Sequence, residues 1–432
     1  MALANAATGG LAAYDPGHDL PALRKRFGSA LAELGSNENP LGPSPRALAA
    51  IQVALPDVLR YPDPKGGALK AALSAHLGVQ PAQITLGNGS HELLMLIAQC
   101  FADASTSIVF SEYGFAVFPI AAAASGAQAI RVPAFARDHA VMPLGHELDA
   151  MAAAVRADTR IVYLANPNNP TGTWFDDETL GRFLARVPAT TLVVVDEAYH
   201  EYVVAEGLSG ALPFLARHPN LVVTRTFSKA HALAGLRVGY AISSPGVAAV
   251  LERLRESFNV NGLALAAAEA ALGDQAHVAR ARQWNLAERE WLAERLRARG
   301  LRVLPSQTNF VLVDFARDAA PIESALFQRG VIVRPMGGYG LPRCLRISVG
   351  SRGENERLLE ALEDYSVAAG RADSPSPASG RRWPDCARQE QRANGEAGPE
   401  GERQGRRESG LDEGKSPPGS TPSSANGGRP LA

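Results

Sequence analysis

Residues 221–240 read Leu221-Val222-Val223-Thr224-Arg225-Thr226-Phe227-Ser228-Lys229-Ala230-His231-Ala232-Leu233-Ala234-Gly235-Leu236-Arg237-Val238-Gly239-Tyr240. The β-branched run at the start predicts a buried strand, and Lys229 follows close to its end. Burial strips water from a lysine amine, lowers its pKa and makes the amine a nucleophile toward carbonyl groups. The hydroxyl groups of Thr226 and Ser228 and the guanidinium of Arg237 suit a phosphate. This stretch therefore predicts a strand that ends in a reactive amine beside an anion-binding cradle.

Upstream of this stretch the pattern is that of an α/β protein. Short apolar strands are predicted at residues 84–86, 108–110, 160–165 and 191–195, with helices between them. The strands at 160–165 and 191–195 and the strand at 221–226 recur about every thirty residues. This spacing is typical of strand–helix–strand units of a parallel sheet. We therefore expect a large domain with a mainly parallel sheet flanked by helices.

Polar residues follow three of these strands. They are Asn166-Pro167-Asn168-Asn169-Pro170-Thr171-Gly172, then Asp196-Glu197-Ala198-Tyr199, then Ser228-Lys229. Ligands of open α/β sheets bind at the carboxyl ends of the strands. We therefore expect Asn169, Asp196, Tyr199 and Lys229 to converge although they are far apart in the sequence.

The rest of the chain divides by composition. We expect an N-terminal arm (1–35), an ordered loop and small-domain segment rich in Pro, Gly and Asn (36–67), the large cofactor-binding domain (68–272) and a smaller α/β C-terminal domain (273–370). Residues 371–432 are dominated by Gly, Pro, Ser, Arg, Glu and Gln, and too few apolar residues remain to offset the entropy of ordering the backbone. We expect this tail to be disordered.

Composition excludes several classes of function. The 432 residues include 43 basic and 44 acidic ones, so a net charge of −1 gives no electrostatic footprint for nucleic acid or an anionic membrane. Three scattered cysteines lack the spacing of a metal site, and an odd number argues against a disulfide framework. The start does not resemble a secretory signal, and no apolar stretch reaches the length of a membrane span. A cytoplasmic protein that acts on small molecules is expected, without a metal site.

An amine beside a phosphate cradle favours pyridoxal phosphate, although a surface lysine at a strand end is the alternative. Lys229 would carry the covalent link and move the proton, and Asp196, at the end of an apolar strand, would keep the pyridine nitrogen protonated. Asn169 and Tyr199 would bond the phenolic oxygen, and Tyr113 would stack on the ring, unless it is a core aromatic. The phosphate would lie in a nest of backbone and side-chain donors, for which the candidates are Gly89, Ser90, His91, Thr226, Ser228 and Arg237.

Two alternatives concern the charged residues. Asp196 and Glu197 could hold magnesium beside a nucleotide, but no phosphate-binding loop of the Gly-x-x-x-x-Gly-Lys-Ser/Thr type precedes them. Arg346 lies inside a predicted apolar strand, and Arg334 follows another. A buried arginine needs a carboxylate, which the protein or a substrate can supply, and for Arg334 both remain open.

Together these motifs resemble the fold-type I pyridoxal-phosphate aminotransferases of the class I/II group, and within that group the histidinol-phosphate aminotransferases. The resemblance runs from about Tyr14 to Ala369. It rests on the motifs quoted above and on Ser36-Asn37-Glu38-Asn39-Pro40-Leu41-Gly42-Pro43-Ser44, Val333-Arg334-Pro335-Met336 and Leu345-Arg346-Ile347-Ser348-Val349-Gly350.

The resemblance implies a homodimer in which Tyr61 of one subunit reaches the cofactor phosphate of the other. It implies that Asn37 and Arg346 bind substrate, with Arg346 on the α-carboxylate, and that Arg334 and Tyr14 hold the distal phosphate. Glutamate and 2-oxoglutarate would be the second substrate pair. His91, where an acidic residue is usual, and His231, where an aromatic is usual, depart from the family pattern.

The same fold leaves other reactions open. An aromatic amino-acid aminotransferase or a threonine-phosphate decarboxylase would use the same cofactor chemistry. A regulator built on such a core would need a nucleic-acid-binding module, and neither the arm nor the tail has a helix-turn-helix pattern. Transfer of an amino group between histidinol phosphate and 2-oxoglutarate is the expected activity.

Overall fold

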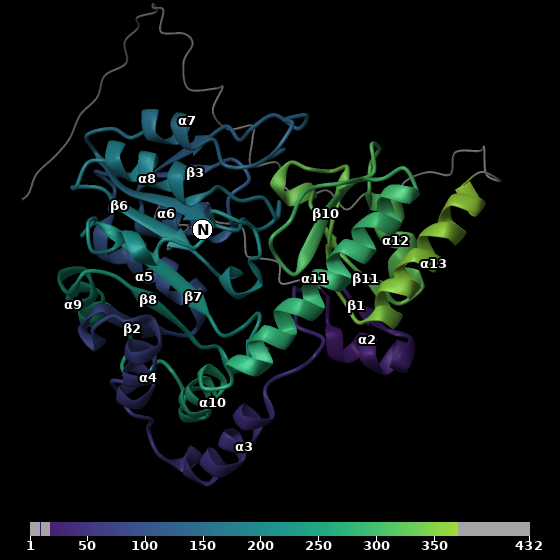
Figure 1. Ribbon diagram of the computed structural model, residues 1–432. Coiled ribbons are helices and arrows are strands. Elements are labelled where there is room, and N and C mark those ends of the chain that lie inside the picture. Colours follow the sequence, from purple (N-terminus) through teal and green to yellow (C-terminus); the bar gives the residue numbers. More distant parts are fainter. Residues whose placement is uncertain (1–8, 10–17, 370–432) are drawn as a thin grey trace, which may run out of the picture. The chain divides into compact units, whose positions relative to one another are not determined.

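Seven strands form the central sheet of the computed structural model, which describes residues 9 and 18–369 (Figure 1). The strand order is β2-β8-β7-β6-β5-β3-β4. Strand β8 is antiparallel to both of its neighbours, and the pairs among the other strands are parallel. The strands are β2 (Ile84–Gly87), β3 (Ser107–Ser111), β4 (Gln128–Val132), β5 (Thr159–Ala165), β6 (Leu192–Asp196), β7 (Leu221–Thr226) and β8 (Gly239–Ile242).

Helices cover both faces of this sheet because its central strands are apolar on both sides. On β6, Val194 packs with helices α5 (Gly89–Phe101) and α6 (Val117–Ser125). Its neighbours Val193 and Val195 point to the opposite face and pack with α7 (Leu148–Ala153) and α8 (Asp177–Arg186). Such double burial is typical of parallel sheets and leaves the strand ends as the place for polar residues.

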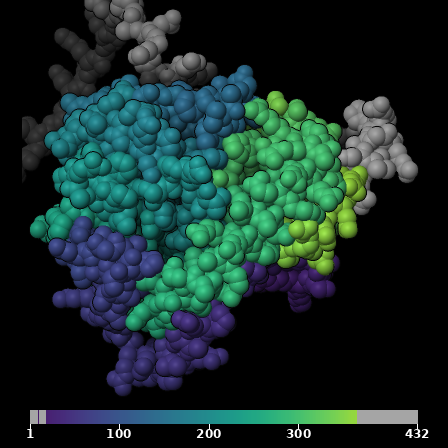
Figure 2. Space-filling model, in the orientation of Figure 1, coloured from purple at the N-terminus to yellow at the C-terminus, as the bar shows by residue number. Residues whose placement is uncertain are grey.

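Two further groups of helices pack beside the sheet. Helices α3 (Pro45–Ala54), α4 (Gly67–Leu77) and α10 (Gly262–Leu272) share a core with β2 and β8. Helix α9 (Pro245–Leu254) buries Leu251 on the face that α5 covers. In the space-filling view the segment with α3, drawn in purple, lies at the surface (Figure 2).

A second, antiparallel sheet has the order β12-β13-β10-β9, with strands β9 (Arg302–Val303), β10 (Phe310–Asp314), β12 (Arg334–Pro335) and β13 (Cys344–Ser348). Its core includes side chains of α11 (Gln275–Ala298), α12 (Ala320–Gln328) and α13 (Arg352–Ala369). Next to it, β1 (Ala32–Glu33) pairs in parallel with β11 (Val331–Ile332). Helix α2 (Leu20–Phe27) buries Leu23 against Ile332.

The predicted α/β class, with a mainly parallel sheet and a smaller α/β part, is confirmed. Several elements differ from expectation. Residues 36–67, expected as an ordered loop, contain α3, which begins after the N-cap Ser44. Strands β4 and β8 were not expected; β4 is largely exposed, with Gln128 and Arg131 among its five residues, whereas β8 is fully buried. The expected tail 371–432 and Tyr14 lie outside the described residues, and the predicted domain boundaries stay a prediction.

Within the described residues, no helix is both long and apolar enough to cross a membrane.

Candidate active site

The predicted residues Asn169, Asp196, Tyr199 and Lys229 follow or end neighbouring strands β5, β6 and β7. Asp196 is the last residue of β6, and Lys229 comes three residues after β7 ends. The charges of Asp196, Arg237 and Arg346 all act on the Lys229 amine. The sheet therefore brings these side chains together at one edge, as expected from the sequence.

Lys229 is held as a half-buried amine. Its Nζ donates a hydrogen bond to the backbone oxygen of Ser36 at 3.1 Å and lies 5.9 Å from the centre of the Tyr199 ring. Burial, followed by the charge of Arg346, lowers the pKa of Lys229 to about 8. An amine with this pKa is deprotonated more readily near neutral pH than an ordinary lysine, which suits a nucleophile or a base.

Asp196 is only 5% exposed. The Thr224 hydroxyl donates to its Oδ1 at 2.8 Å. Burial raises the pKa of Asp196 to about 7, and the Lys229 charge opposes this rise. A carboxylate buried in this way is stabilised strongly by a cationic partner, such as a protonated ring nitrogen.

Glu197, the neighbour of Asp196, serves a different purpose. Its carboxylate accepts from Arg225 Nε at 2.9 Å, while Asp196 accepts from Thr224. Since successive residues of β7 point to opposite faces, the two carboxylates do not share one site. No cluster of metal-ligating side chains is found in the part of the chain that the structure describes. The geometry therefore does not support the magnesium alternative.

Tyr199 and Asn169 are positioned by residues from the second sheet and the segment before α3. Asn37 Nδ2 donates to the Tyr199 hydroxyl at 2.9 Å, and Ser348 fixes Asn37 by a 2.8 Å bond from the Asn37 backbone N–H. Burial raises the pKa of Tyr199 to about 12, so the phenol stays protonated. Arg346 Nη1 donates to Asn169 Oδ1 at 2.6 Å. Asn37, expected on the substrate, thus contacts Tyr199 in this structure.

The residues of the predicted phosphate nest lie where β7, β8 and α5 meet. Thr226 Oγ1 lies 2.9 Å from Ser228 Oγ, and Arg237 Nη1 donates to the same Ser228 oxygen at 3.3 Å. A Cβ on Gly89 would lie 2.6 Å from Arg237 Nη2, and one on Gly239 would lie 2.8 Å from the Ser90 backbone nitrogen. Only glycines therefore let the guanidinium and the start of α5 come this close.

The other predicted cofactor residues lie around this nest or away from it. His91 is half-buried in the first turn of α5, where burial and the Arg237 charge lower its pKa. Tyr113 is half-buried against an aliphatic cluster that includes Leu144. Tyr61 is 82% exposed and stacks on Phe258 with ring centres 4.7 Å apart. Tyr61 is thus not buried in the site of its own chain.

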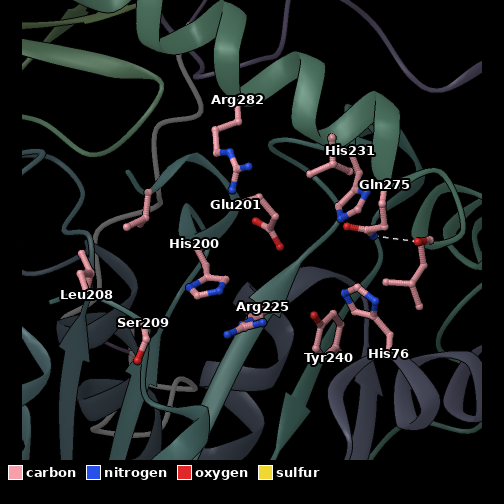
Figure 3. Close-up of a pocket in the computed structure, with 13 residues that line it drawn as sticks. His76, His200, Glu201, Leu208, Ser209, Arg225, His231, Tyr240, Gln275 and Arg282 are labelled. Carbon is pink, nitrogen blue, oxygen red and sulfur yellow. Dashed lines mark hydrogen bonds between the residues drawn. The ribbon is translucent and has the colours of Figure 1, made fainter. Parts of the chain in front are cut away.

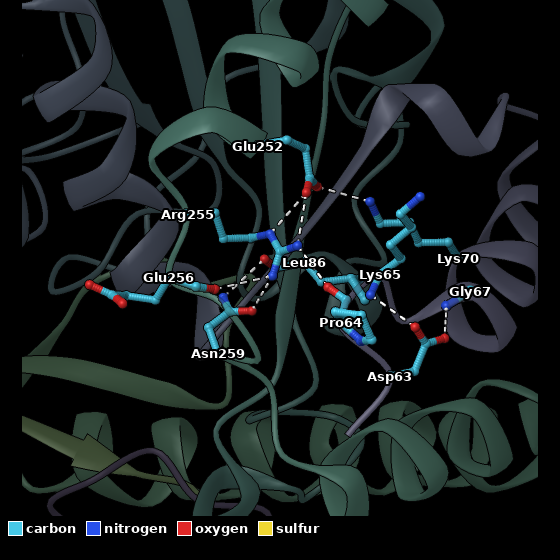
Figure 4. A network of polar contacts seen from close by, with 10 residues as sticks. All are labelled: Asp63, Pro64, Lys65, Gly67, Lys70, Leu86, Glu252, Arg255, Glu256 and Asn259. Atoms are coloured by element: carbon cyan, nitrogen blue, oxygen red, sulfur yellow. Dashed lines mark hydrogen bonds and ion pairs between the residues drawn. The ribbon is translucent and has the colours of Figure 1, made fainter. Parts of the chain in front are cut away.

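A polar network that the sequence did not indicate connects the loop around Asp63 with the end of α9 (Figure 4). Arg255 Nη2 donates to the Pro64 oxygen at 2.8 Å, and its Nη1 donates to Asn259 Oδ1 at 2.6 Å. Asn259 in turn donates to Glu92 Oε2 at 2.8 Å, and Glu92 accepts from the backbone N–H of Asn88. The network therefore fixes the position of the loop around Asp63 relative to the start of α5, where the residues of the predicted phosphate nest lie. No local pattern marks it, because its members come from three separate segments.

Two arginines face each other on the second sheet. Arg334 of β12 and Arg346 of β13 are direct cross-strand partners. Residues opposite each other on antiparallel strands share a face, and like charges in that position destabilise the pair unless an anion lies between or near them. Arg346 also donates through Nη2 to the Gly35 oxygen at 2.8 Å. This arrangement suits substrates with anionic groups.

The residues present fit pyridoxal phosphate. The buried carboxylate of Asp196 matches a protonated ring nitrogen. The amine of Lys229 is close enough to Asp196 for the charge of each group to shift the pKa of the other. Gly89 has no Cβ that would collide with the Arg237 guanidinium, so backbone N–H groups and the guanidinium can both approach a bound phosphate. The cofactor predicted from the sequence therefore agrees with the geometry of the site.

Comparison with known proteins places the chain among aminotransferases. Residues 30–362 match the family model described as aminotransferase class I and II. Histidinol-phosphate aminotransferase 2 of Pseudomonas aeruginosa is 51% identical over 365 residues, which cover 84% of this chain and 97% of the relative. Histidinol-phosphate aminotransferase 1 of Thiobacillus denitrificans is 50% identical over 362 residues, which cover 83% of this chain and 92% of the relative.

Solved structures agree with this placement. The crystal structure of histidinol-phosphate aminotransferase from Sinorhizobium meliloti in complex with pyridoxal-5'-phosphate matches with a TM-score of 0.77 and 35% identity, over 85% of this chain and 99% of that one. L-threonine-O-3-phosphate decarboxylase from Porphyromonas gingivalis matches with a TM-score of 0.68 and 22% identity, over 78% and 100%, which shows a common fold alone. The chain therefore belongs to the class I and II aminotransferase family.

Proposed function

We propose that this protein is a pyridoxal-phosphate-dependent aminotransferase that transfers the amino group of histidinol phosphate to 2-oxoglutarate. The observation that carries the proposal is the convergence of Lys229, Asp196 and the Arg237 cradle at one sheet edge. The identity of about half of all residues to histidinol-phosphate aminotransferases over most of the chain supports the choice of substrate.

Each residue of the site has a proposed task. Pyridoxal phosphate, when bound, supplies an electron sink for the bond that breaks at the substrate α-carbon. Lys229 would hold the cofactor covalently until the amino group of the substrate displaces it, and the freed amine, with a lowered pKa, would then move the proton at the α-carbon. Asp196 keeps the ring nitrogen protonated, while Asn169 and Tyr199 orient the ring through its phenolic oxygen.

The remaining predicted residues complete the proposed cofactor site. Tyr113 covers one ring face. The phosphate lies among the donors at the start of α5 and after β7, which are Gly89, Ser90, His91, Thr226, Ser228 and Arg237. These residues belong to the proposed large domain, 68–272.

Arg346 and Arg334 are the proposed anion-binding residues of the substrate site. Arg346 binds the α-carboxylate of glutamate, and Arg334, together with Tyr14, holds the phosphate of histidinol phosphate. Their position as cross-strand partners supports this division, because one sheet face then carries two positive charges. Asn37 positions Tyr199 through its hydrogen bond.

We further propose a homodimer in the cytoplasm, with Tyr61 entering the site of the other subunit. Tyr61 is almost fully exposed, and the segment before it contains several exposed apolar side chains, whose burial by a second copy would be favourable. They are Leu48, Val53, Leu55, Val58 and Leu59.

A substrate panel with 2-oxoglutarate as the acceptor tests the activity. We expect a higher kcat/KM for histidinol phosphate than for phenylalanine or tyrosine, and no turnover in the Lys229→Ala variant. A preference for the aromatic amino acids would overturn the substrate assignment. Release of carbon dioxide from threonine phosphate without an acceptor would favour the decarboxylase alternative.

A further inference from the structure

A cavity of about 350 Å³ opens on the other face of β7 (Figure 3). Thr224 and Thr226 point toward the site of Asp196 and Ser228, so Arg225 between them points the opposite way. Arg225 and Tyr240 are cross-strand partners and therefore share that face. The cavity is lined by His76, His200, Glu201, Val203, Leu208, Ser209, Arg225, His231, Tyr240, Leu272, Gln275, Val278 and Arg282.

The cavity has a buried floor and an open rim. Arg225, His231 and Tyr240 are 6%, 5% and 4% exposed, whereas Gln275 and Arg282 on α11 are exposed. Its volume lies near the lower end of the roughly 300–1,000 Å³ that small-molecule sites occupy. The cavity is thus open to solvent and large enough for a small metabolite.

Two buried polar atoms on its walls have no hydrogen-bond partner within the described residues. They are Oε2 of Glu201 and Nδ1 of His231. Most buried polar groups in proteins are hydrogen-bonded, and each exception calls for a water or a ligand. Both atoms belong to residues that line the cavity, so one occupant can satisfy both.

Two charged residues that line the cavity, Glu201 and Arg282, form no ion pair within the described residues. Arg225 is already paired with Glu197, at 2.8 Å. Glu201 forms no ion pair within 4.0 Å among the described residues, and burial raises its pKa to about 7. Arg282 reaches from α11 toward the cavity, and it has no ion pair or hydrogen bond within the described part of the chain (Figure 3). One carboxylate and one guanidinium therefore face the same space without being joined.

A carboxylate and a guanidinium across one small space match a molecule that carries both an ammonium and a carboxylate. We propose that this cavity is a second binding site that takes a free α-amino acid, with its ammonium on Glu201 and its carboxylate on Arg282. The side chain of the ligand lies against Tyr240 and Leu272, and His231 Nδ1 bonds a polar atom of the ligand. A single anion would leave Glu201 unmatched, and a single cation would leave Arg282 unmatched.

The position of the cavity connects it to both parts of the molecule. His231 comes two residues after Lys229, and Arg282 lies on α11, whose other half packs in the core of the second sheet. An occupant of the cavity contacts the segment that carries the reactive amine and the helix that supports the substrate-binding arginines. The inference stands on the cavity itself and does not depend on the proposed reaction.

Isothermal titration calorimetry of the full-chain holoenzyme, with the visible absorbance recorded in parallel, tests the proposal. The probes are 2-aminoisobutyrate, which has no hydrogen on its α-carbon and is not turned over, L-leucine and L-glutamine. We expect at least one probe to give saturable heat without a change in absorbance, because absorbance reports only the site with the cofactor. Acetate and methylammonium, each with half of the recognised charge, should bind at least about tenfold more weakly.

Matched variants locate the binding. Arg282→Gln and Glu201→Gln should each weaken it about tenfold or more, which corresponds to about 1.4 kcal/mol. Arg297→Gln and Glu294→Gln, which change exposed residues of α11 outside the cavity lining, should leave it unchanged. Absence of absorbance-silent binding with all three probes, binding that survives in Arg282→Gln, or acetate binding as tight as that of the amino acids would each overturn the proposal.

Discussion

Gly239 lets the end of β8 approach the start of α5 at a distance that no side chain tolerates. A Cβ there would lie 2.8 Å from the Gly89 backbone carbon and 2.9 Å from the Arg225 oxygen, and both are backbone atoms. We predict that Gly239→Ala costs about 1–3 kcal/mol of unfolding free energy by overpacking and weakens pyridoxal phosphate binding by distorting the phosphate nest. Urea unfolding and an absorbance titration with the cofactor measure the two effects.

Gly235→Ala is the matched control for this change. Nothing lies within 4 Å of a Cβ at Gly235, and that residue precedes Arg237 in the same segment. An alanine there should leave both quantities unchanged or stabilise the fold slightly. Equal effects of the two substitutions would contradict a special role for Gly239.

Asp196 makes the stability of the cofactor-free protein depend on pH. Its pKa is about 7 in the fold, compared with 3.8 ordinarily. Between these values the unfolded chain loses the proton and the fold keeps it, so the contribution of Asp196 to stability falls as the pH rises. This loss of unfolding free energy is at most about 1.4 kcal/mol per pH unit, and we predict that the Asp196→Asn variant does not show it.

Urea unfolding of the cofactor-free wild type and of Asp196→Asn at pH 5 and pH 8 checks this prediction. The variant should gain stability relative to the wild type on going from pH 5 to pH 8. Glu201 is buried with a similar pKa in both proteins, so only the difference between them isolates Asp196. A difference that does not change with pH would rule the prediction out.

The sequence predicted which side chains lie together at the edge of the central sheet, while their roles stay a prediction. Lys229, Asp196 and Asn169 follow strands whose apolar runs are easy to recognise, and the strand ends of a parallel sheet meet by topology. The contacts that position them were not predictable, because Asn37 reaches Tyr199 across 162 positions of sequence. Glu201 and Arg225 gave no local signal for a cavity, since other residues that line it, such as His76 and Arg282, come from distant helices.

At the scale of elements, hydrogen bonds of Arg255 connect the end of α9 to the loop before α4. Arg255 bonds Pro64, Asn259 and Glu252, and Glu252 also accepts from Lys70 at 2.9 Å. We predict that Arg255→Gln loosens the Tyr61 loop and the start of α5, and weakens cofactor binding about tenfold, with a smaller effect on kcat at saturating cofactor. Titration of the cofactor-free protein by absorbance gives the dissociation constant.

Arg253→Gln, in the last turn of α9, is the control. Arg253 is exposed, and Figure 4 does not include it among the residues of the network. Its substitution should leave the dissociation constant as in the wild type. If both variants bind the cofactor equally well, the network does not position the nest.

The sequence predicted the strands that contain a long apolar run, and it missed both the exposed β4 and the fully buried β8. The run Leu221–Thr226 was predicted as a strand and is β7, which is fully buried. Strand β4, Gln128–Val132, lies at the sheet edge with mostly exposed residues, and Gln128 and Arg131 interrupt its apolar residues, so no apolar run indicated a strand. Helix α3 had a readable start, with Ser44 as N-cap and Pro45 at the first turn, but the preceding proline-rich segment favoured a loop.

At the scale of the whole molecule, the proposed dimer shares each active site between two chains. We predict that Tyr61→Ala and Lys229→Ala, each with strongly reduced or absent turnover, recover part of the activity when they are unfolded and refolded together. In a mixed dimer one site combines the intact Lys229 of one subunit with the intact Tyr61 of the other.

Steady-state turnover of the mixture, compared with that of each variant refolded alone, is the measurement. A mixture of Lys229→Ala and Asp196→Asn is the control, because both changes fall within one subunit's share of the site and no intact site can form. Recovery in this control, or its absence in the first mixture, would exclude an exchange of Tyr61 between subunits. Sedimentation velocity of the wild type should show a dimer.

The pairing of β1 with β11 has a consequence for how the chain is made. Ala32 and Val331 are about 300 residues apart, yet they are partners in a parallel ladder. A ribosome that adds roughly 5–20 residues per second needs about 15–60 s to cover that distance, so the first strand of a nascent chain stays without its partner until synthesis is nearly over. In ribosome-bound fragments that stop before Val331, residues 20–33 should therefore be accessible to proteases, although all strands of the seven-stranded sheet have been synthesised.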